Sequence, residues 1–433
     1  VVFEKGNNRI EWAGMIDWLL KTEEGKAALE DTLKLGRKIR EQYKYIIACG
    51  IGGSGEGVEV IRRNFGQTAK TKLYPLMTPD AGAVNGLIKS IADSEGITIE
   101  EVLKNSAVFF ITKSGGTPET LSHFEYFKGA YKKAGINTKE HIWIMTDPGS
   151  KMDTPKHKED YNWMTIQLNG GSGIGGRFTS PATNIPLLFL SILNDGIVKE
   201  MLEEAQMMNN VPAQEDIFLK LAAFIEYYTK QAKNNNITLF IPEEFKVWFL
   251  QLFEESLGKE LKGVTFFSAG EKLTPENLRP DDIFIRLSIG QEKPRQDLWN
   301  FLQEKKYPAF ELNIKDKNGI FGLQFGLARA VIALAYLWQI CAVDQDAVED
   351  YKKGGIKIKE KLETGQTIDD ILKEKDWDYA KSGNINFYYG PLLKAGLITH
   401  QEIMDRLVVL GFYLINNTPI SAWYAAVVNI LAE

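Results

Sequence analysis

The sequence predicts an α/β fold with two doubly wound, largely parallel sheets and an added helical C-terminal region. Three observations lead to this prediction. Short apolar runs of strand length alternate with helical patterns, which is typical of parallel sheets covered by helices on both faces. These runs fall into two series, separated by a long helical stretch from about residue 180 to residue 233. Beyond Lys352 the pattern is helical, at first polar and then apolar.

The elements of the first half follow one another in a clear order. A helical pattern runs from Ile10 to about Tyr43, with Trp12 and Ile16 among the apolar residues on one face. Helices are expected near Val58 to Asn64 and from Leu121 to Ala134. The strands expected in this half are 45–50, 72–77, 107–112, 142–147 and 163–168.

The second half repeats the alternation without a detectable sequence repeat. Its helices are expected near 245–257 and 296–304, and its strands at 237–242, 264–269, 283–288 and 309–314. We therefore divide the chain into an N-terminal helical segment (1–43), a first α/β subdomain (44–195), a second α/β subdomain (196–345) and a C-terminal helical region (346–433).

The bulk composition is that of an ordinary globular protein that can bury a large core. The chain has 433 residues, of which 44% are hydrophobic and 25% charged. The net charge of −6, without a basic stripe, argues against nucleic acid as a partner. A small anionic ligand in a local cationic pocket is compatible with this charge.

Cysteine usage and the apolar segments favour a cytoplasmic protein that does not enter a membrane. Cys49 and Cys341 lie far apart, so we expect no disulfide framework. The longest apolar stretch, 328–343, is interrupted by Arg329 and Gln339 and predicts a buried helix. The first residues carry no signal-peptide pattern.

The stretch "GIGGSGEG", residues 50–57, follows the first predicted strand. It matches the G-x-G-x-x-G pattern of dinucleotide-binding loops, and Asp80 follows near the end of the next strand. Physically, the backbone N–H groups near Gly53 and the hydroxyl of Ser54 could approach any anion at a helix N-terminus. A tight structural turn, a dinucleotide site and a simpler phosphate site all remain open at this point.

The stretch "TKSGGTPET", residues 112–120, favours the phosphate site. Gly115 and Gly116 let the backbone N–H groups turn inward, and a compact cluster of donors suits a terminal phosphomonoester better than a bridging pyrophosphate. A hydroxyl-rich helix cap is the structural alternative. The candidate ligands in this stretch are Thr112, Lys113, Ser114 and Thr117.

Three later stretches carry further candidate residues. Arg177 lies in the glycine-rich segment 170–188, where a cation could stabilise developing negative charge, or could equally be a solvated surface arginine. Glu254 and Glu255 lie near the end of a helical pattern and are either surface carboxylates or a general base. Gln345 and Lys352 follow the buried helix and are polar groups that could enter a cleft.

Taken together and in this order, the five stretches resemble the glucose-6-phosphate isomerase family. The matching segments are "GIGGSGEG", "TKSGGTPET", "GGRF", "Q-x-x-x-E-S-x-G-K" and "DQ-x-x-VE-x-x-K", which span about residues 45 to 353. Each segment is short, but five in the family's order are specific. The form "ESLGKELKG" looks closest to the isomerase half of fused transaldolase/isomerase enzymes, although no transaldolase portion is present.

The resemblance implies a sugar isomerase fold and the interconversion of glucose 6-phosphate and fructose 6-phosphate in glycolysis and gluconeogenesis, without metal or cofactor. Glu255 would move the proton between C2 and C1, Arg177 would stabilise the enediolate, and Lys352 would lie near the ring oxygen. Gln251 and Gln345 would position the substrate. The phosphate would be held by Gly53, Ser54, Thr112, Lys113, Ser114 and Thr117. A homodimer is expected because active sites of this family form at the subunit interface.

The chain departs from the family pattern in one chemically important respect. The family usually has a histidine for ring opening between the glutamate segment and the C-terminal signature. The four histidines here are His123, His141, His157 and His400, none of which lies in that interval. Ring opening is then expected to use Lys352, water, a histidine of a neighbouring subunit, or spontaneous opening in solution.

Three other functions stay open on the sequence. A non-catalytic sugar-phosphate-binding protein of the same fold would bind ligand without turnover. An isomerase of another phosphosugar would share the same residues. A nicotinamide-dependent oxidoreductase would use the first glycine loop for a dinucleotide.

Overall fold

The structure, a computed structural model of the chain, consists of two compact units, Val1–Gln345 and Asp346–Glu433. The residues that it describes are 3–5, 8–10, 12–232, 236–260, 262–268, 273–344, 354, 357–358, 360–367, 370–371, 374, 378–382 and 385–389. The first unit contains both predicted sheets, and the boundaries proposed within it at 43/44 and 195/196 remain predictions.

The first sheet is parallel throughout and has the strand order β4-β3-β5-β6-β7. Its strands are β3 (Tyr45–Cys49), β4 (Lys72–Leu76), β5 (Ser106–Ile111), β6 (Ile142–Thr146) and β7 (Asn162–Thr165). The predicted strand positions are confirmed to within a few residues, since each strand is a short run of largely buried residues between turn signals.

Both faces of this sheet are buried, as expected for a parallel sheet. Along β3, Ile46 and Ala48 pack into one apolar cluster, whereas Tyr45, Ile47 and Cys49 pack into another, because successive side chains of a strand point to opposite faces. The first cluster is closed by α2 (Glu23–Gln42), α3 (Gly53–Phe65) and α9 (Asn184–Asn194). The second is closed by α4 (Ala81–Glu95), α5 (Ile99–Lys104) and α6 (Pro118–Lys133).

The second sheet is also parallel and has the order β11-β10-β8-β9. Its strands are β8 (Asn236–Phe240), β9 (Thr265–Ser268), β10 (Ile283–Ile289) and β11 (Ala309–Ile314). One face packs on α11 (Ile217–Ala232), α12 (Glu243–Leu250) and α14 (Ile320–Trp338), and the other on α13 (Gln296–Glu304). Together the two sheets confirm the predicted α/β fold class.

Some predicted helical stretches are divided in the structure. The N-terminal pattern forms a hairpin, β1 (Phe3–Lys5) and β2 (Asn8–Ile10), then α1 (Trp12–Lys21) and α2, which Thr22 caps. The stretch from 180 to 233 forms α9, η2 (Asp195–Ile197), α10 (Val198–Asn209) and α11. Asn194 breaks the run because its side chain accepts from the Gly196 N–H at 3.2 Å and so favours a turn.

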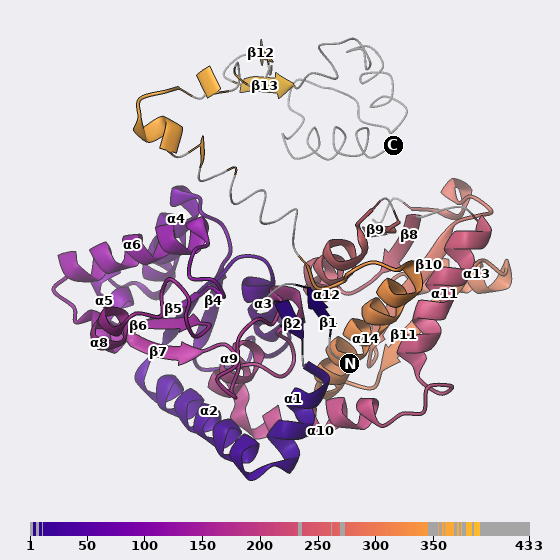
Figure 1. Cartoon of the computed structure of the whole chain (residues 1–433), viewed down its shortest axis with the longest axis horizontal. Coiled ribbons are helices and arrows are strands. Elements are labelled where there is room, and N and C mark those ends of the chain that lie inside the picture. The colour runs from indigo at the N-terminus through magenta and orange to yellow at the C-terminus, as the bar shows by residue number, and fades with distance from the viewer. Residues whose placement is uncertain are drawn as a thin grey trace. The chain divides into compact units, whose positions relative to one another are not determined.

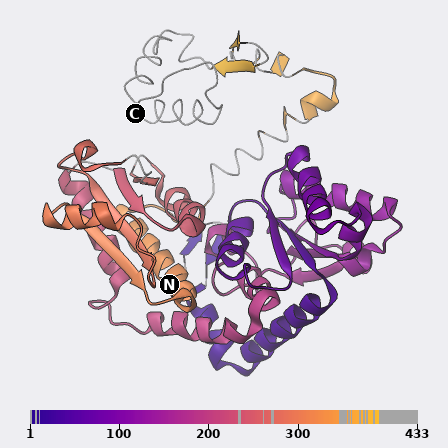
Figure 2. The ribbon, with the colours of Figure 1, turned by 180° about the vertical axis from the view of Figure 1, so that it is seen from behind.

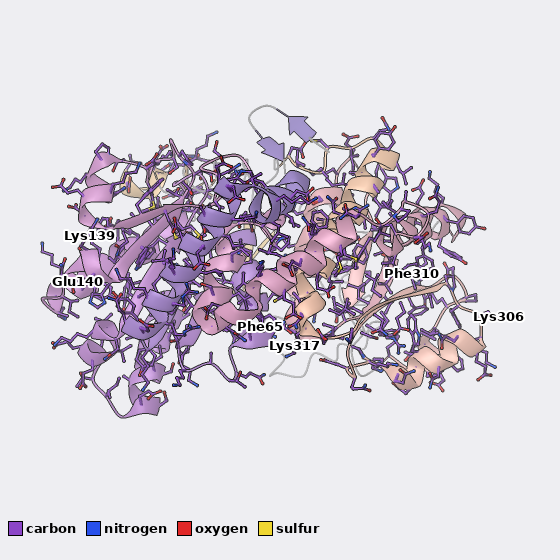
Figure 3. The ribbon with its side chains drawn as sticks, turned by 90° about the horizontal axis from the view of Figure 1, so that it is seen from below. Phe65, Lys139, Glu140, Lys306, Phe310 and Lys317 are labelled. Carbon is purple, nitrogen blue, oxygen red and sulfur yellow. The ribbon has the colours of Figure 1, made fainter. Side chains whose placement is uncertain are left out.

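A single apolar cluster runs through both halves of the first unit. It includes buried residues of α3, α9, α10, α12 and α14 together with one face of each sheet. Figures 1 and 2 show the two sheets on opposite sides of this unit, with α3 and α12 between them. Phe65 and Lys317 lie close together in Figure 3, where the Lys317 ammonium donates to the carbonyl of Asn64 at 3.2 Å.

Helix α14 confirms the predicted buried helix, although it ends at Trp338 and not at Val343. Among the described residues, it is the one helix that is long and apolar enough to cross a membrane. However, 78% of its most apolar stretch is buried inside the unit. Gln339 ends the helix with φ at 54°, and the segment up to Asp344 is then non-helical. Because the helix ends early, residues 341–344 form a non-helical segment that contacts Arg177 and Lys259.

One described segment of the second unit differs from the helical pattern that the sequence predicted. Residues 378–389 contain an antiparallel hairpin of β12 (Asp378–Ser382) and β13 (Ile385–Tyr389). The aromatic run from Phe387 to Tyr389 has high strand propensity, and Gly383 and Asn384 between the strands are turn formers. The helical periodicity expected there was therefore a wrong interpretation of this segment.

Candidate active site

The strand order of the first sheet places two of the predicted loops side by side. Chain order reverses at β3, because β4 lies on one side of it and β5 on the other. The loops after β3 and β5 therefore leave the carboxyl edge of the sheet on either side of this switch point. Ligands of open α/β sheets bind at such a point.

The turn Thr112–Thr117, called the phosphate turn below, is a compact cluster of hydroxyl groups. The Oγ1 atoms of Thr112 and Thr117 lie 3.0 Å apart, and Ser114 Oγ accepts from the Gly116 N–H at 3.3 Å. Gly115 adopts φ at 65°, which favours glycine. Thr117 is the N-cap residue of α6 but makes no side-chain cap bond, so its hydroxyl faces the cluster instead of closing the helix.

The end of β6 and the loop that follows it hydrogen-bond the backbone of the phosphate turn. Thr146 Oγ1 donates to the carbonyl of Thr112 at 2.6 Å, and the Lys151 N–H donates to the carbonyl of Ser114 at 3.2 Å. Asp147 is 6% exposed and accepts from the Gly173 N–H at 2.9 Å. Burial raises the pKa of Asp147, while the Gly173 N–H and the charge of Lys113 oppose that rise.

The first glycine loop touches the segment 170–177, called the arginine loop below. A Cβ added to Gly53 would lie 2.0 Å from the carbonyl carbon of Gly176 and 2.4 Å from the Arg177 nitrogen, so only glycine fits. A Cβ on Gly52 would lie 2.8 Å from Gln251 Nε2. Ser54 is buried in the first turn of α3. The loop that resembled a dinucleotide motif thus brings three predicted segments together.

Arg177 is 2% exposed and is held on several sides. It lies in the short helix η1 (Gly176–Phe178), and its Nε donates to Ser256 Oγ at 2.7 Å. Its Nη1 donates to Glu255 Oε1 at 2.8 Å, and its Nη2 donates to the carbonyls of Ala342 and Asp344. These bonds use four of the five N–H donors of a guanidinium, which leaves one on Nη1. Burial lowers the pKa of Arg177, and Glu255 and Asp344 counteract this.

The two adjacent glutamates have different partners. Glu255 lies at the end of the π-helical turn η3 (Gln251–Glu255), a widened turn that is frequent at functional sites. Its two oxygens accept from Arg177 and from Gln251 Nε2, the latter at 3.1 Å. Glu254 instead accepts from the Phe266 N–H at 3.0 Å and so anchors strand β9. The geometry therefore distinguishes a site carboxylate from a structural one.

Gln251 is positioned to contact a ligand as well as Glu255. Its Oε1 atom is buried and has no hydrogen-bond partner among the described residues. A buried amide oxygen without a partner is costly, so a ligand hydroxyl would stabilise it.

Several residues of the site were not singled out from the sequence. Ser256 orients Arg177, and Asp147 links the phosphate turn to the arginine loop through its contact with Gly173. The Lys259 ammonium donates to the carbonyls of Cys341 and Asp344, at 2.6 and 2.9 Å, and pairs with the Asp344 carboxylate. Ser256, Lys259 and Asp344 all belong to the two quoted signature segments, and that membership was the available signal.

These contacts bring together some of the predicted site residues but not all of them. Gly53, Arg177, Gln251 and Glu255 come together directly, and the phosphate turn lies at the same sheet edge. Gln345 and Lys352 lie outside the described residues.

Comparison with known proteins gives consistent results. No protein-family model matches the chain. A glucose-6-phosphate isomerase of Prochlorococcus marinus (strain MIT 9312) is 26% identical over 402 residues, which cover 83% of this chain and 73% of that protein. The glucose-6-phosphate isomerase of Mycoplasma mycoides is 25% identical over 334 residues, covering 74% and 72%.

The chain is similar in sequence to these glucose-6-phosphate isomerases over most of its length. Among solved structures, a glucose-6-phosphate isomerase from Chlamydia trachomatis has a TM-score of 0.68 at 15% identity, covering 86% of this chain and 82% of that chain. A hypothetical protein from Thermus thermophilus has a TM-score of 0.62 at 18% identity, covering 83% and 91%. These likenesses confirm the fold, and the curated relatives confirm the predicted resemblance.

The three histidines that the structure describes make structural hydrogen bonds. His123, His141 and His157 each hydrogen-bond a backbone carbonyl, at 2.7, 2.8 and 3.1 Å. His123 is 1% exposed, and burial lowers its pKa. These three histidines therefore stabilise the backbone of the first α/β subdomain. His400 lies outside the described residues.

Proposed function

We propose that this protein is a glucose-6-phosphate isomerase that interconverts glucose 6-phosphate and fructose 6-phosphate. The observation that carries the proposal is the carboxylate of Glu255, held between Arg177 and Gln251 where two glycine loops meet. An aldose–ketose isomerisation needs one carboxylate base and one fixed cation close together. A protein that only bound the phosphate group would need no carboxylate base.

In the proposed reaction the substrate's phosphate occupies the phosphate turn, which fixes the sugar by a group remote from the reacting carbons. Thr112, Ser114 and Thr117 would supply hydroxyl donors, and Lys113 a positive charge. Ser54 would contribute from the start of α3, whose N-terminal N–H groups favour an anion.

The chemical step uses the open-chain sugar. Glu255 removes the proton from C2 of the aldose and returns it to C1, while the hydroxyl proton on O2 is transferred to O1. The intermediate is an enediolate, and the unused N–H donor of Arg177 Nη1 would stabilise its negative oxygen. Because Arg177 is buried, this stabilisation would act in a low-dielectric environment where it is large.

The remaining parts of the proposal concern groups at the margins of the site. Gln251, and Gln345 from the segment after Asp344, would position the substrate, and Lys352 would assist ring opening. A homodimer is proposed on the family resemblance, and a cytoplasmic location on the cysteine usage and the apolar segments. A sugar-phosphate isomerase acting on another phosphosugar would use the same groups.

The test is turnover of fructose 6-phosphate to glucose 6-phosphate, measured by a coupled assay on the wild type and on Glu255→Gln. The wild type is expected to be active, and kcat of the variant is expected to fall by about 10³-fold or more, since glutamine cannot accept the proton. Glu254→Gln is the matched control, because its amide oxygen can still accept from Phe266, and it should keep nearly full activity.

Each alternative function gives a different result. Binding of fructose 6-phosphate without turnover in the wild type would leave a non-catalytic binding protein. Stabilisation by NAD, and not by sugar phosphate, in a thermal-shift measurement would favour an oxidoreductase. Equal loss in Glu254→Gln and Glu255→Gln would contradict the assignment of the base.

A further inference from the structure

The loop after β6 holds Lys151 tightly against the phosphate turn. Its backbone N–H donates to the carbonyl of Ser114 at 3.2 Å. A Cβ added to Gly115 would lie 2.5 Å from the Met152 nitrogen and 2.9 Å from the Lys151 nitrogen, so the two backbones are in direct contact. The position of Lys151 relative to the turn is therefore set by the main chain and not by a freely moving loop.

The side chain of Lys151 runs across Gly116. The position that a Cβ on Gly116 would occupy lies 3.4 Å from Lys151 Cδ, 3.7 Å from Cε and 3.5 Å from Nζ. The end of the lysine thus lies beside the turn, with its ammonium close to where a side chain at residue 116 would begin. Because residue 116 has no side chain, the lysine can reach the turn.

The charges around Lys151 leave its ammonium available for an anion. The nearby Lys156 and Lys158 pair with Asp160 and Asp153, at 2.9 and 2.5 Å. Among the described residues, no carboxylate forms such an ion pair with Lys151. A phosphomonoester carries a charge of about −1.5 to −2 near neutral pH, so a second cation beside Lys113 would match it.

We propose that Lys151 is a phosphate-binding residue of this site, its ammonium contacting the ligand's phosphate group across Gly116. Lys113 is itself a residue of the phosphate turn, whereas Lys151 belongs to the neighbouring loop after β6. The two charges would therefore lie on different sides of the phosphate. The inference rests on the proposed function for the identity of the ligand, but it can be tested with inorganic phosphate alone.

The first test measures the binding of inorganic phosphate by titration calorimetry to the wild type, Lys151→Met and Lys151→Arg. Methionine keeps much of the length of the side chain and removes the charge, so binding is expected to weaken about three- to tenfold. Arginine keeps the charge and should bind within about twofold of the wild type. Raising the salt concentration should reduce the difference between wild type and Lys151→Met.

The control is Lys133→Met, which removes an exposed lysine from the opposite end of α6. It changes the net charge equally and should leave phosphate binding unchanged. Thermal melting checks that each variant is folded, and Lys151→Gln replaces the methionine variant if that one does not fold. Phosphate binding to Lys151→Met as tight as to the wild type, or equal weakening in Lys133→Met, would overturn the proposal.

A second test restores a polar group by another route. Gly116→Ser in the Lys151→Met background places a hydroxyl near the position of the lost ammonium, and contact distances of 3.4–3.7 Å leave room for it. This double variant is expected to regain part of the phosphate binding. Binding no stronger than that of Lys151→Met alone would contradict a contact across Gly116.

The outcomes also separate this inference from the proposed function. If the wild type turns over fructose 6-phosphate, Lys151→Met should raise KM and change kcat by less than about twofold, since it removes ground-state binding. If the wild type binds phosphate but has no turnover, the proposed function fails while the comparison of lysine variants still decides the role of Lys151. If the wild type binds no inorganic phosphate, the proposed role of Lys151 fails, whereas turnover of fructose 6-phosphate still decides the proposed function.

Discussion

Glu254 and Glu255 show how much depends on the direction of one side chain. The sequence presents two adjacent glutamates near the end of a helix, and such residues are usually solvated. In the structure Glu254 bonds the backbone of β9, whereas Glu255 bonds Arg177 and Gln251. Neighbouring residues of a helix lie about 100° apart around its axis, so the two carboxylates contact different parts of the molecule.

Glu56 gives a prediction about stability and pH at the scale of one residue. Burial, together with the nearby charge of Glu59, raises the pKa of Glu56 to about 7, while Arg63 opposes the rise. Because the folded state holds this proton more tightly than the unfolded state, the protein loses stability as pH rises from about 4.5 to 7. The penalty is complete above about pH 7.

Glu56→Gln removes the half-buried carboxylate, so its free energy of unfolding should exceed that of the wild type by roughly 1–3 kcal/mol at about pH 8. The gain should nearly vanish at about pH 4, where Glu56 is protonated in the folded state and largely so in the unfolded state. Urea unfolding at both pH values is the measurement, with the exposed Glu159→Gln as control. A gain that is equal at both pH values would contradict the prediction.

At the scale of elements, the start of α6 distinguishes a helix cap from a ligand site. Thr117 precedes α6 without capping it, whereas Thr98 caps α5 in a capping box with Glu101. Thr117→Val should raise KM for the sugar phosphate about tenfold or more, and should cost less than about 1 kcal/mol of stability. Thr98→Val should cost about 1 kcal/mol and leave KM unchanged.

Steady-state kinetics and urea unfolding of both variants check this pair. If Thr117→Val lost as much stability as Thr98→Val and kept its KM, the threonine would be a cap after all. The contrast is useful because both threonines precede helices with acidic residues in the first turn, but only Thr98 makes a side-chain cap bond.

Helices and strands could be predicted where the hydrophobic pattern of the sequence agreed with the burial of the segment in the fold. Strands β3, β5 and β10 are largely apolar runs that are buried on both faces, so their positions followed from the sequence. The long stretch after residue 180 has the helical period, but local turn chemistry divides it at Asn194 and again at residues 210–216, which contain Pro212. The hairpin at 378–389 was missed because the helical period of the surrounding sequence was given more weight than the strand propensity of Phe387–Tyr389.

At the scale of the whole first unit, Lys259 connects the glutamate segment to the stretch that follows α14. It bonds the carbonyls of Cys341 and Asp344 and pairs with the Asp344 carboxylate, which is 9% exposed. Arg177 bonds the same Asp344 carbonyl. Two cations thus hold the segment that leads to Gln345 and Lys352.

Lys259→Met should therefore destabilise the protein by about 3 kcal/mol, because it leaves a buried carboxylate without this cation. It should also lower kcat, since Arg177 and residues 341–344 would lose a shared support. Lys262→Met, which removes an exposed partner of Glu260, should change stability by less than about 1 kcal/mol. Urea unfolding and the coupled assay measure both effects, and similar behaviour of the two variants would contradict this role.

The sequence by itself determined the α/β class, the position of most strands and the residue types of the site. These features depend on hydrophobic period and on short motifs, which are local properties of the chain. Only the tertiary structure decided that Gly53 must contact the arginine loop, that Glu255 pairs with Arg177, and that Lys259 pairs with Asp344. Each of these contacts joins residues distant in sequence, and no local pattern carries that information.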